Sequence, residues 1–240
     1  MRKWLVNGVG LLALLALTAC SPGKTGTSWR MSYMGLYWGD ISNVWVEVKD
    51  GASSRFLNCS FRGDYIVTDS EEYVEIGELY GDVGFRRQAT PGPRGFSPEW
   101  LAVDVVSDQE FNGRPAGTSL ADVTMFVGCS AAEYVAAGYP YYEKFHPVED
   151  EVAAEWWAAL SLDDVRSGYH WETTPVAIPL SEFGQDDWRL LTDDPFCIVF
   201  TEEPAVRKHT FTVTFRFTDG KSVSGSVELD FDATAASEEQ

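Results

Sequence analysis

Residues able to carry acid–base or metal chemistry are sparse in this 240-residue chain. Its three histidines, His146, His170 and His209, lie far apart in sequence. Only His170 has an acidic residue two positions away, Glu172, and on a strand the two would share a face where they could ligate a metal or act as a base. A surface or core histidine with satisfied hydrogen bonds is the simpler interpretation. We therefore assign no catalytic residue, metal or cofactor.

Adjacent acidic residues are frequent, but none has the spacing of a known site. The pairs are Asp163 and Asp164, Asp186 and Asp187, Asp193 and Asp194, and Glu202 and Glu203. A calcium site requires several oxygen ligands that converge on one point, and a glycosidase needs two carboxylates at a fixed separation. Neither kind of site can be assigned from these pairs. The zinc-protease and α/β-hydrolase patterns are also absent from the sequence. We expect these pairs at helix starts and in loops.

Aromatic residues are abundant, at 14% of the chain. Tyr and Trp on a surface suit sugar rings or protein partners, although a β-rich core also needs large residues. The segment Tyr-Pro-Tyr-Tyr at residues 139–142 follows no periodic pattern that would bury it. Tyr139, Tyr141, Tyr142 and Trp156 are therefore the candidate binding residues.

The first 19 residues have the pattern of a secretory signal peptide. A basic start precedes an apolar run that ends in Leu-Thr-Ala-Cys at residues 17–20. This ending resembles the lipobox of bacterial lipoproteins. The resemblance implies cleavage before Cys20 and acylation of its thiol and amino group, for example with palmitate, which would give stable membrane anchoring. An ordinary signal peptide or short membrane anchor that contains a cysteine is the alternative.

The segment after the cysteine predicts how the domain is held. Residues 20–28 are small and polar, and we expect a flexible tether. Ser21 stands where lipoproteins of the inner membrane often carry aspartate, so we expect the outer membrane. The first acidic residue is Asp40, which favours the periplasmic face over the cell surface. A domain over residues 29–232 and a disordered acidic tail over 233–240 complete the expected organisation.

The net charge of −19 sets the class of partner. A strongly acidic chain repels phosphates, so we expect no binding to nucleic acid. The predicted partners are the membrane, through the lipid anchor, and an envelope protein or glycan.

Three further cysteines, Cys59, Cys129 and Cys197, lie in apolar surroundings. Their spacing matches no metal or redox motif. The cell envelope permits a disulfide with one thiol left over, and buried unpaired cysteines are the simpler alternative.

Two hairpins are predicted. Alternating apolar residues flank Asp-Gly at residues 50–51, and a two-residue turn would place Val46 opposite Arg55 and Val44 opposite Leu57.

In the second hairpin, the apolar residues of the two strands lie on the same face of the sheet only if the loop between the strands has an odd number of residues. A three-residue loop over residues 218–220, with its glycine in the left-handed conformation, places Phe215 opposite Val223 and Phe211 opposite Val227.

Other segments complete a mainly β prediction. Further strands are expected at residues 64–68, 73–79, 101–106, 175–180 and 196–201. Pro175 and Pro179 would keep their strand at a sheet edge. Short strands separated by turns indicate an antiparallel β-sandwich of the immunoglobulin-like or Greek-key type. A single domain is expected, and two smaller halves are the alternative.

Residues 119–167 predict a short helical insertion. A capping box begins at Ser130, and Gly138 would end its helix. A second helix is expected from an apolar stripe at every fourth residue, and a further capping box begins at Ser161. The stripe consists of Val148, Val152, Trp156 and Leu160.

One internal segment resembles lipoproteins of unknown function from Bacteroidetes-type bacteria. The matching residues are Ser107-Asp108, Glu110-Phe111-Asn112, Pro115-Ala116-Gly117-Thr118, Leu120 and Asp122. A strand over residues 196–200, Pro204 and Asp-Gly-Lys at 219–221 also fit this family's ending. The resemblance implies an envelope location and a β-rich fold, and it carries over no activity and no site residue.

These observations predict a lipid-anchored envelope protein that acts as a binding or structural module. A fimbrial or adhesin-type lipoprotein is a specific version of this prediction. An exposed strand edge that accepts a donated strand would support it. A hydrolase of glycans or peptides is the alternative from another class, and a deep pocket holding two carboxylates, or His170 with a carboxylate and a Cys or Ser in reach, would support it.

Overall fold

The computed structural model describes residues 32–68, 70–86, 92–148, 150–162 and 172–232. The strands in these ranges are β1 (Leu36–Asp50), β2 (Arg55–Ile66), β3 (Arg94–Phe96), β4 (Trp100–Ser107), β5 (Thr124–Ser130), β6 (Thr174–Pro179), β7 (Leu191–Phe200), β8 (Lys208–Phe217) and β9 (Ser222–Asp230). The α-helices there are α1 (Glu71–Tyr80), α2 (Ala132–Ala136) and α3 (Glu151–Ala159), and single 3-10 turns are η1 (Ala121–Val123), η2 (Tyr142–Lys144) and η4 (Gln185–Trp188).

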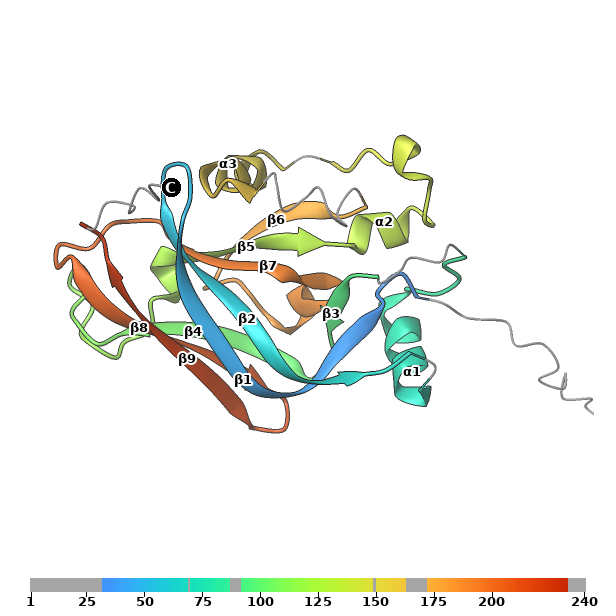
Figure 1. Ribbon diagram of the computed structural model, residues 1–240, viewed down its shortest axis with the longest axis horizontal. Helices are drawn as coiled ribbons and strands as arrows, with labels where there is room; N and C mark the ends of the chain where they lie inside the picture. Colours follow the sequence, from blue (N-terminus) through green and yellow to red (C-terminus); the bar gives the residue numbers. More distant parts are fainter. Residues whose placement is uncertain (1–31, 69, 87–91, 149, 163–171, 233–240) are drawn as a thin grey trace, which may run out of the picture.

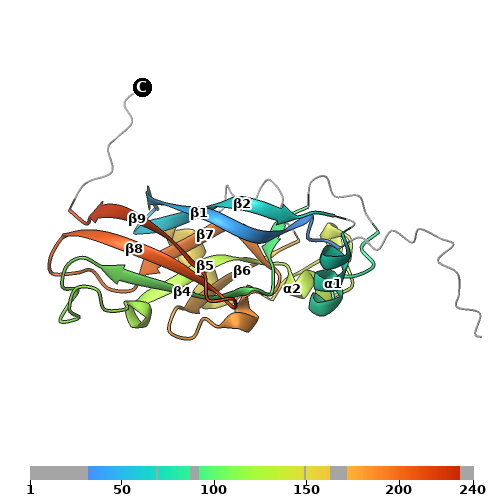
Figure 2. The ribbon, with the colours of Figure 1, turned by 90° about the horizontal axis from the view of Figure 1, so that it is seen from below.

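Four of the strands close into a ring. The larger sheet has the order β2-β1-β3-β7-β5-β6, and an additional pairing of β2 with β7 closes its first four strands. β4, β8 and β9 form a second sheet, and the core lies between it and the ring (Figures 1 and 2). The mainly β class predicted from the sequence is confirmed. The closed ring was not part of the predicted immunoglobulin-like arrangement.

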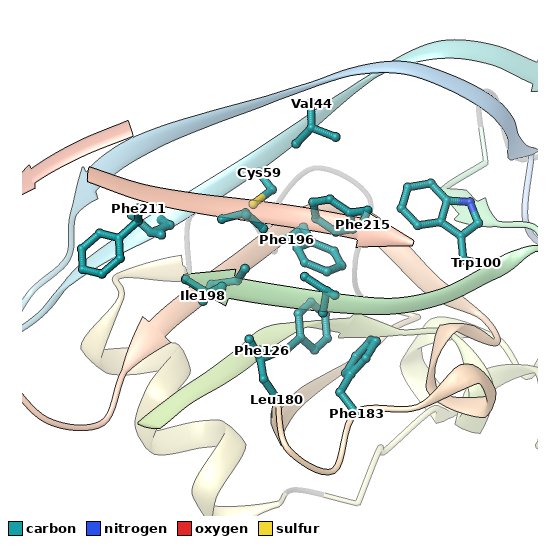
Figure 3. Packing of buried hydrophobic residues seen from close by; sticks show 14 of the residues in the cluster. Val44, Cys59, Trp100, Phe126, Leu180, Phe183, Phe196, Ile198, Phe211 and Phe215 are labelled. Carbon is teal, nitrogen blue, oxygen red and sulfur yellow. The ribbon is translucent and has the colours of Figure 1, made fainter. Parts of the chain in front are cut away.

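The main core is built from aromatic rings that meet edge to face. The centroid of the Phe61 ring lies between 5.2 and 5.5 Å from those of Phe96, Trp100, Phe196 and Phe215, each nearly perpendicular to it. These residues come from β2, β3, β4, β7 and β8, so one ring joins both sheets. Figure 3 shows the same core, with Phe126 and Phe183 extending it. Edge-to-face pairs add about 0.5–1.5 kcal/mol each beyond the burial of apolar area.

The predicted hairpin of β8 and β9 is confirmed. Phe215 pairs with Val223 and Phe211 with Val227. Gly220 has φ of +87°, and its N–H donates to the carbonyl oxygen of Phe217 at 3.0 Å. The two apolar rows therefore cover the core together.

The predicted register of β1 and β2 is wrong by four residues. Val46 pairs with Cys59 and Val48 with Leu57, because the loop has four residues and the N–H of Gly51 donates to the carbonyl oxygen of Ser54. The end of α3 accounts for the longer loop. The N–H of Ser53 donates to the carbonyl oxygen of Ala159 at 3.2 Å, and a Cβ added at Gly51 would lie 2.5 Å from that same oxygen. Because the shift is an even number, each residue keeps its predicted face.

The strand predicted at residues 73–79 is instead the helix α1. The hydroxyl of Ser70 accepts a hydrogen bond from the N–H of Tyr73 at 3.1 Å, and Gly81 ends the helix with φ of +73°. The buried residues Tyr73, Ile76 and Tyr80 recur at helical spacing.

The predicted helical insertion contains an internal strand. β5 lies between β6 and β7, within residues 119–167. α2 and its stop at Gly138, with φ of +74°, match the prediction. The capping box predicted at Ser130 is wrong, because the helix begins after Ala131 without a side-chain cap and the carboxylate of Glu133 accepts from Val148 and Thr174 instead. The expected capping box of the next segment, from Ser161 onward, extends beyond the described residues.

The predicted apolar stripe is not the buried face of α3. The helix begins at Glu151, where the carboxylate of Asp150 accepts from the N–H of Ala153 at 3.0 Å. Val148 therefore precedes the helix and is 75% exposed. The buried helical residues are Ala153 and Trp157.

β6 is an edge strand, as its prolines predicted. The N–H of Leu180 donates to the carbonyl oxygen of Thr124, so alternation turns the backbone of Pro175, Ala177 and Pro179 away from β5. Two of these three residues have no N–H. This edge therefore lacks most of the donors that an added strand would need.

We predict that Gly220→Val lowers the free energy of unfolding by about 1 kcal/mol or more, because a β-branched residue resists positive φ. Gly220→Asn is the matched control and should cost less, because asparagine tolerates this conformation. Urea unfolding measures both. Equal stability of Gly220→Val and the wild type would contradict the loop assignment.

Candidate binding site

The predicted aromatic binding residues do not form one surface. Tyr139 is half-buried and packs in a second core cluster with Tyr33 and Tyr134, whereas Trp156 packs in a third cluster beneath α3. Tyr141 is 61% exposed. The side chain of Tyr142, and Cys20 and His170, lie outside the described part of the structure. Tyr139 and Trp156 thus contribute to packing in different places.

A buried carboxylate ties the start of the described chain to the second cluster. Asp82 is fully buried and accepts hydrogen bonds from the N–H groups of Tyr33 and Met34 at 2.7 and 2.9 Å. The hydroxyl of Tyr139 donates to the same carboxylate at 2.8 Å. Desolvation raises the pKa of Asp82, and these donors oppose the rise. The carboxylate thereby holds the N-terminal end of the fold next to α1.

The segment that resembles envelope lipoproteins serves to close the edge of β4. The N–H groups of Gly117 and Leu120 donate to the carbonyl oxygens of Ser107 and Val105, each at 2.8 Å. Phe111 is fully buried. The residues of the motif are therefore accounted for by the fold.

His209 is a satisfied core histidine. Its Nδ1 lies 2.7 Å from the hydroxyl of Ser107 and its Nε2 lies 2.7 Å from the carbonyl oxygen of Val206. A carbonyl oxygen can only accept, so Nε2 carries the proton and Nδ1 accepts from Ser107. Both side chains are buried. Of the other histidines, His146 is exposed.

A second buried carboxylate joins the four strands of the ring. Asp193 in β7 accepts from the indole N–H of Trp38 in β1 at 2.8 Å and pairs with the Nε of Arg94 in β3 at 2.9 Å. Nη1 of Arg94 donates to the hydroxyl of Tyr65 in β2 at 3.2 Å. Desolvation raises the pKa of Asp193 to about 6, against the opposing effect of Arg94.

The positions of the acidic pairs differ from the prediction in one case. Asp193 and Asp194 were expected at a helix start or in a loop, and they lie within β7. Asp187 fits the prediction, because its carboxylate accepts from the N–H of Gly184 at the start of η4 at 2.7 Å. Asp163 and Asp164 lie outside the described residues.

The clearest candidate site is a pocket at the turn of the β1–β2 hairpin, called here the hairpin-end pocket. Its volume is about 320 Å³. The lining residues are Asp50, Gly51, Ala52, Ser53, Ser54, Arg55, Phe200, Glu202, Glu203 and Phe231. They come from the hairpin turn and from the ends of β7 and β9. The pocket thus combines carboxylates, hydroxyls, one guanidinium and two aromatic rings.

The wall of this pocket is held by specific contacts. Nε of Arg55 pairs with the carboxylate of Asp50 at 2.6 Å, and its Nη1 donates to the carbonyl oxygen of Asp230. The rings of Phe200 and Phe231 lie 5.7 Å apart at an angle of 73°. Because α3 also fixes the turn through Ala159, the pocket is preformed.

Sequence reasoning missed this pocket. Asp50 and Gly51 were recognised as a turn, but the two-residue loop left no room for Ser53 and Ser54 to line a cavity. The signal present in the sequence was the run of small polar residues before Arg55.

A second pocket, of about 330 Å³, lies at the β1 bulge and is strongly acidic. Asp40, Asp64, Glu72 and Glu99 all line it, and Lys221 lies 3.6 Å from the carboxylate of Asp40. Among the residues that the structure describes, no group of three or more His, Cys, Asp or Glu side chains could hold a metal ion. The three cysteines are free and buried, as the sequence predicted in its simpler alternative.

Comparison of the chain with protein-family models, curated proteins and solved structures found no match. Within the described ranges, no helix combines the length and apolar character needed to cross a membrane.

We predict that Tyr139→Phe lowers the free energy of unfolding by about 1–2 kcal/mol, because buried Asp82 loses a hydroxyl donor. Thermal or urea unfolding of the full chain measures this loss. An unchanged melting curve would show that Tyr139 does not support the fold.

We predict that Asp193 makes the protein less stable as pH rises. A carboxyl whose folded pKa of about 6 exceeds its ordinary 3.8 stabilises the fold fully below about pH 4, and this contribution is lost as pH rises through 6. Between about pH 5 and pH 8 the loss should be on the order of 1 kcal/mol.

The Asp193→Asn variant lacks this titrating carboxyl group. Comparison of the wild type with the variant therefore separates the effect of Asp193 from that of the other acidic groups. The difference in unfolding free energy between wild type and variant should therefore change over this pH range. A difference that stays constant with pH would contradict the raised pKa.

Proposed function

We propose that the protein is a lipid-anchored binding module of the bacterial cell envelope, held in the outer membrane through Cys20. The proposal combines the lipobox-like ending of the signal sequence with the placement of the hairpin-end pocket. Its periplasmic orientation rests on the late first acidic residue, Asp40.

The single observation that carries this proposal is the position of the pocket relative to the start of the fold. β1 begins beside α1, where Asp82 holds Tyr33 and Met34. The β1–β2 turn lies toward the opposite end of the long axis (Figure 1). A membrane anchor that precedes residue 32 would therefore attach to the domain at the end away from the hairpin-end pocket.

The length of the connection suits this arrangement. Fully extended, residues 20–31 could span up to about 40 Å, at roughly 3.3–3.6 Å for each residue. The domain could thus reach a ligand that is not attached to the same membrane.

A fimbrial role by strand donation receives no support from the proline-containing edge of β6. The bridge between Val106 and Ser119 also occupies part of the β4 edge. The pocket is the stronger basis for a binding role.

Lipidation of Cys20 is directly testable in cells. Metabolic labelling with palmitate should mark the wild-type chain, and Cys20→Ala should abolish the label. Cys59→Ala is the matched control and should keep it, because that thiol is buried in the folded domain. Label that persists in Cys20→Ala would overturn the anchor.

A further inference from the structure

Several polar atoms of the hairpin-end pocket retain hydrogen-bonding capacity. Arg55 uses Nε and Nη1 within the protein, and its Nη2 has no partner among the described residues. Glu202 pairs with Arg114 through Oε1, and Glu203 pairs with Arg207 through Oε2, so each has a second oxygen without a partner in the described ranges. The pocket therefore presents both donors and acceptors.

The turn adds groups that can both donate and accept. The hydroxyls of Ser53 and Ser54 have no hydrogen-bond partner among the described residues, and Oδ2 of Asp50 is likewise unpaired there. The turn itself is fixed, because the N–H of Ser53 donates to Ala159 of α3. A ligand would therefore meet these groups in place.

The apolar wall of the pocket is aromatic. Phe200 and Phe231 are both half-buried and line the cavity together. Arg207 lies 5.4 Å from the centre of the Phe231 ring and holds it from one side. Rings placed in this way favour a ligand with an apolar C–H surface beside its polar groups.

The charge of the lining selects among ligands. Each of the three lining carboxylates is already paired with an arginine: Asp50 with Arg55, Glu202 with Arg114 and Glu203 with Arg207. An anionic ligand would therefore find no unpaired cation and would lie beside three carboxylates. A lysine side chain would suit the carboxylates but would meet Arg55 as a like charge. A hydroxyl-bearing ring can donate to carboxylates and also accept from Arg55 and the two serines.

We infer that the hairpin-end pocket binds a neutral sugar, with the hydroxyls on the polar rim and a ring face against the aromatic wall. The volume of about 320 Å³ is at the lower end of the usual range for small-molecule sites, about 300–1,000 Å³, and fits one or two rings. This inference rests on the proposed binding function and names its ligand class.

The test is saturation-transfer NMR on the full-length protein in detergent micelles. The probes are glucose, galactose, mannose, N-acetylglucosamine and chitotriose, with glucuronate as the anionic comparison, glucosamine as the cationic sugar and trilysine as the basic peptide. At least one neutral sugar should receive saturation, and glucuronate should bind at least about tenfold more weakly than that sugar.

Glu203→Gln is the test variant, because its side chain is 75% exposed and its replacement leaves the core intact. Glu228→Gln is the matched control, since Glu228 also forms an exposed ion pair, with Lys208 at 2.9 Å, outside the pocket. We expect Glu203→Gln to weaken sugar binding about tenfold, as loss of one charged hydrogen bond implies, and Glu228→Gln to bind as the wild type does.

Three outcomes would overturn the inference: no sugar binds, Glu203→Gln binds as tightly as the wild type, or trilysine binds while the sugars do not. Palmitate labelling reports separately on the anchor. Labelled Cys20 without sugar binding would reject the ligand class alone, and sugar binding by an unlabelled chain would reject the anchor alone.

Discussion

The fold depends on how one buried carboxylate joins the four strands of the ring. The carboxylate of Asp193 accepts hydrogen bonds from Trp38 and Arg94, and Arg94 also donates to the hydroxyl of Tyr65. The parallel contact of β1 with β3 covers three residue pairs, so this side-chain network reinforces a short ladder. Arg94 also lies 5.9 Å from the centre of the Trp38 ring. Removing the charge of Arg94 would leave the buried carboxylate of Asp193 without its cationic partner, which is costly.

The ring in turn positions the hairpin-end pocket. β1 and β2 run together from this network to the turn at residues 51–54, and Phe56 of β2 pairs with Val199 of β7 near that end. The closure of β2 on β7 therefore brings the turn beside Phe200 and Glu202. Phe231, just after β9, completes the wall, and a Cβ added at Gly225 would lie 2.5 Å from the carbonyl oxygen of Val44, so β9 and β1 approach closely within both strands.

Local patterns were enough to predict the elements whose neighbours are close in sequence. The β8–β9 hairpin followed from alternation and the left-handed preference of Gly220, and the β6 edge followed from its prolines. The β1–β2 register failed because Ala159, more than a hundred residues away, holds the loop. α1 was missed because Val74 and Ile76 alternate with Glu75 and Gly77 as in a strand, while the cap at Ser70 and the buried Tyr80 support a helix.

The candidate site was harder to predict for the same reason. Its residues come from three strand ends that the ring closure brings together, and no motif links Arg55, Glu203 and Phe231 in sequence. Conversely, no periodic pattern in the sequence predicts burial of residues 139–142. Tyr139 is nevertheless half-buried, and its hydroxyl donates to Asp82, which lies in a loop 57 residues away. Aromatic content alone could not distinguish these two outcomes.

Hydrogen–deuterium exchange of the full-length protein, with and without the neutral sugar that receives the strongest saturation, tests the hairpin-end pocket most directly. We expect slower exchange at residues 51–55 and 201–203, with the segment 139–142 unchanged. Protection confined to residues 139–142, with none at the β1–β2 turn, would place ligand binding at the aromatic segment and contradict the hairpin-end pocket.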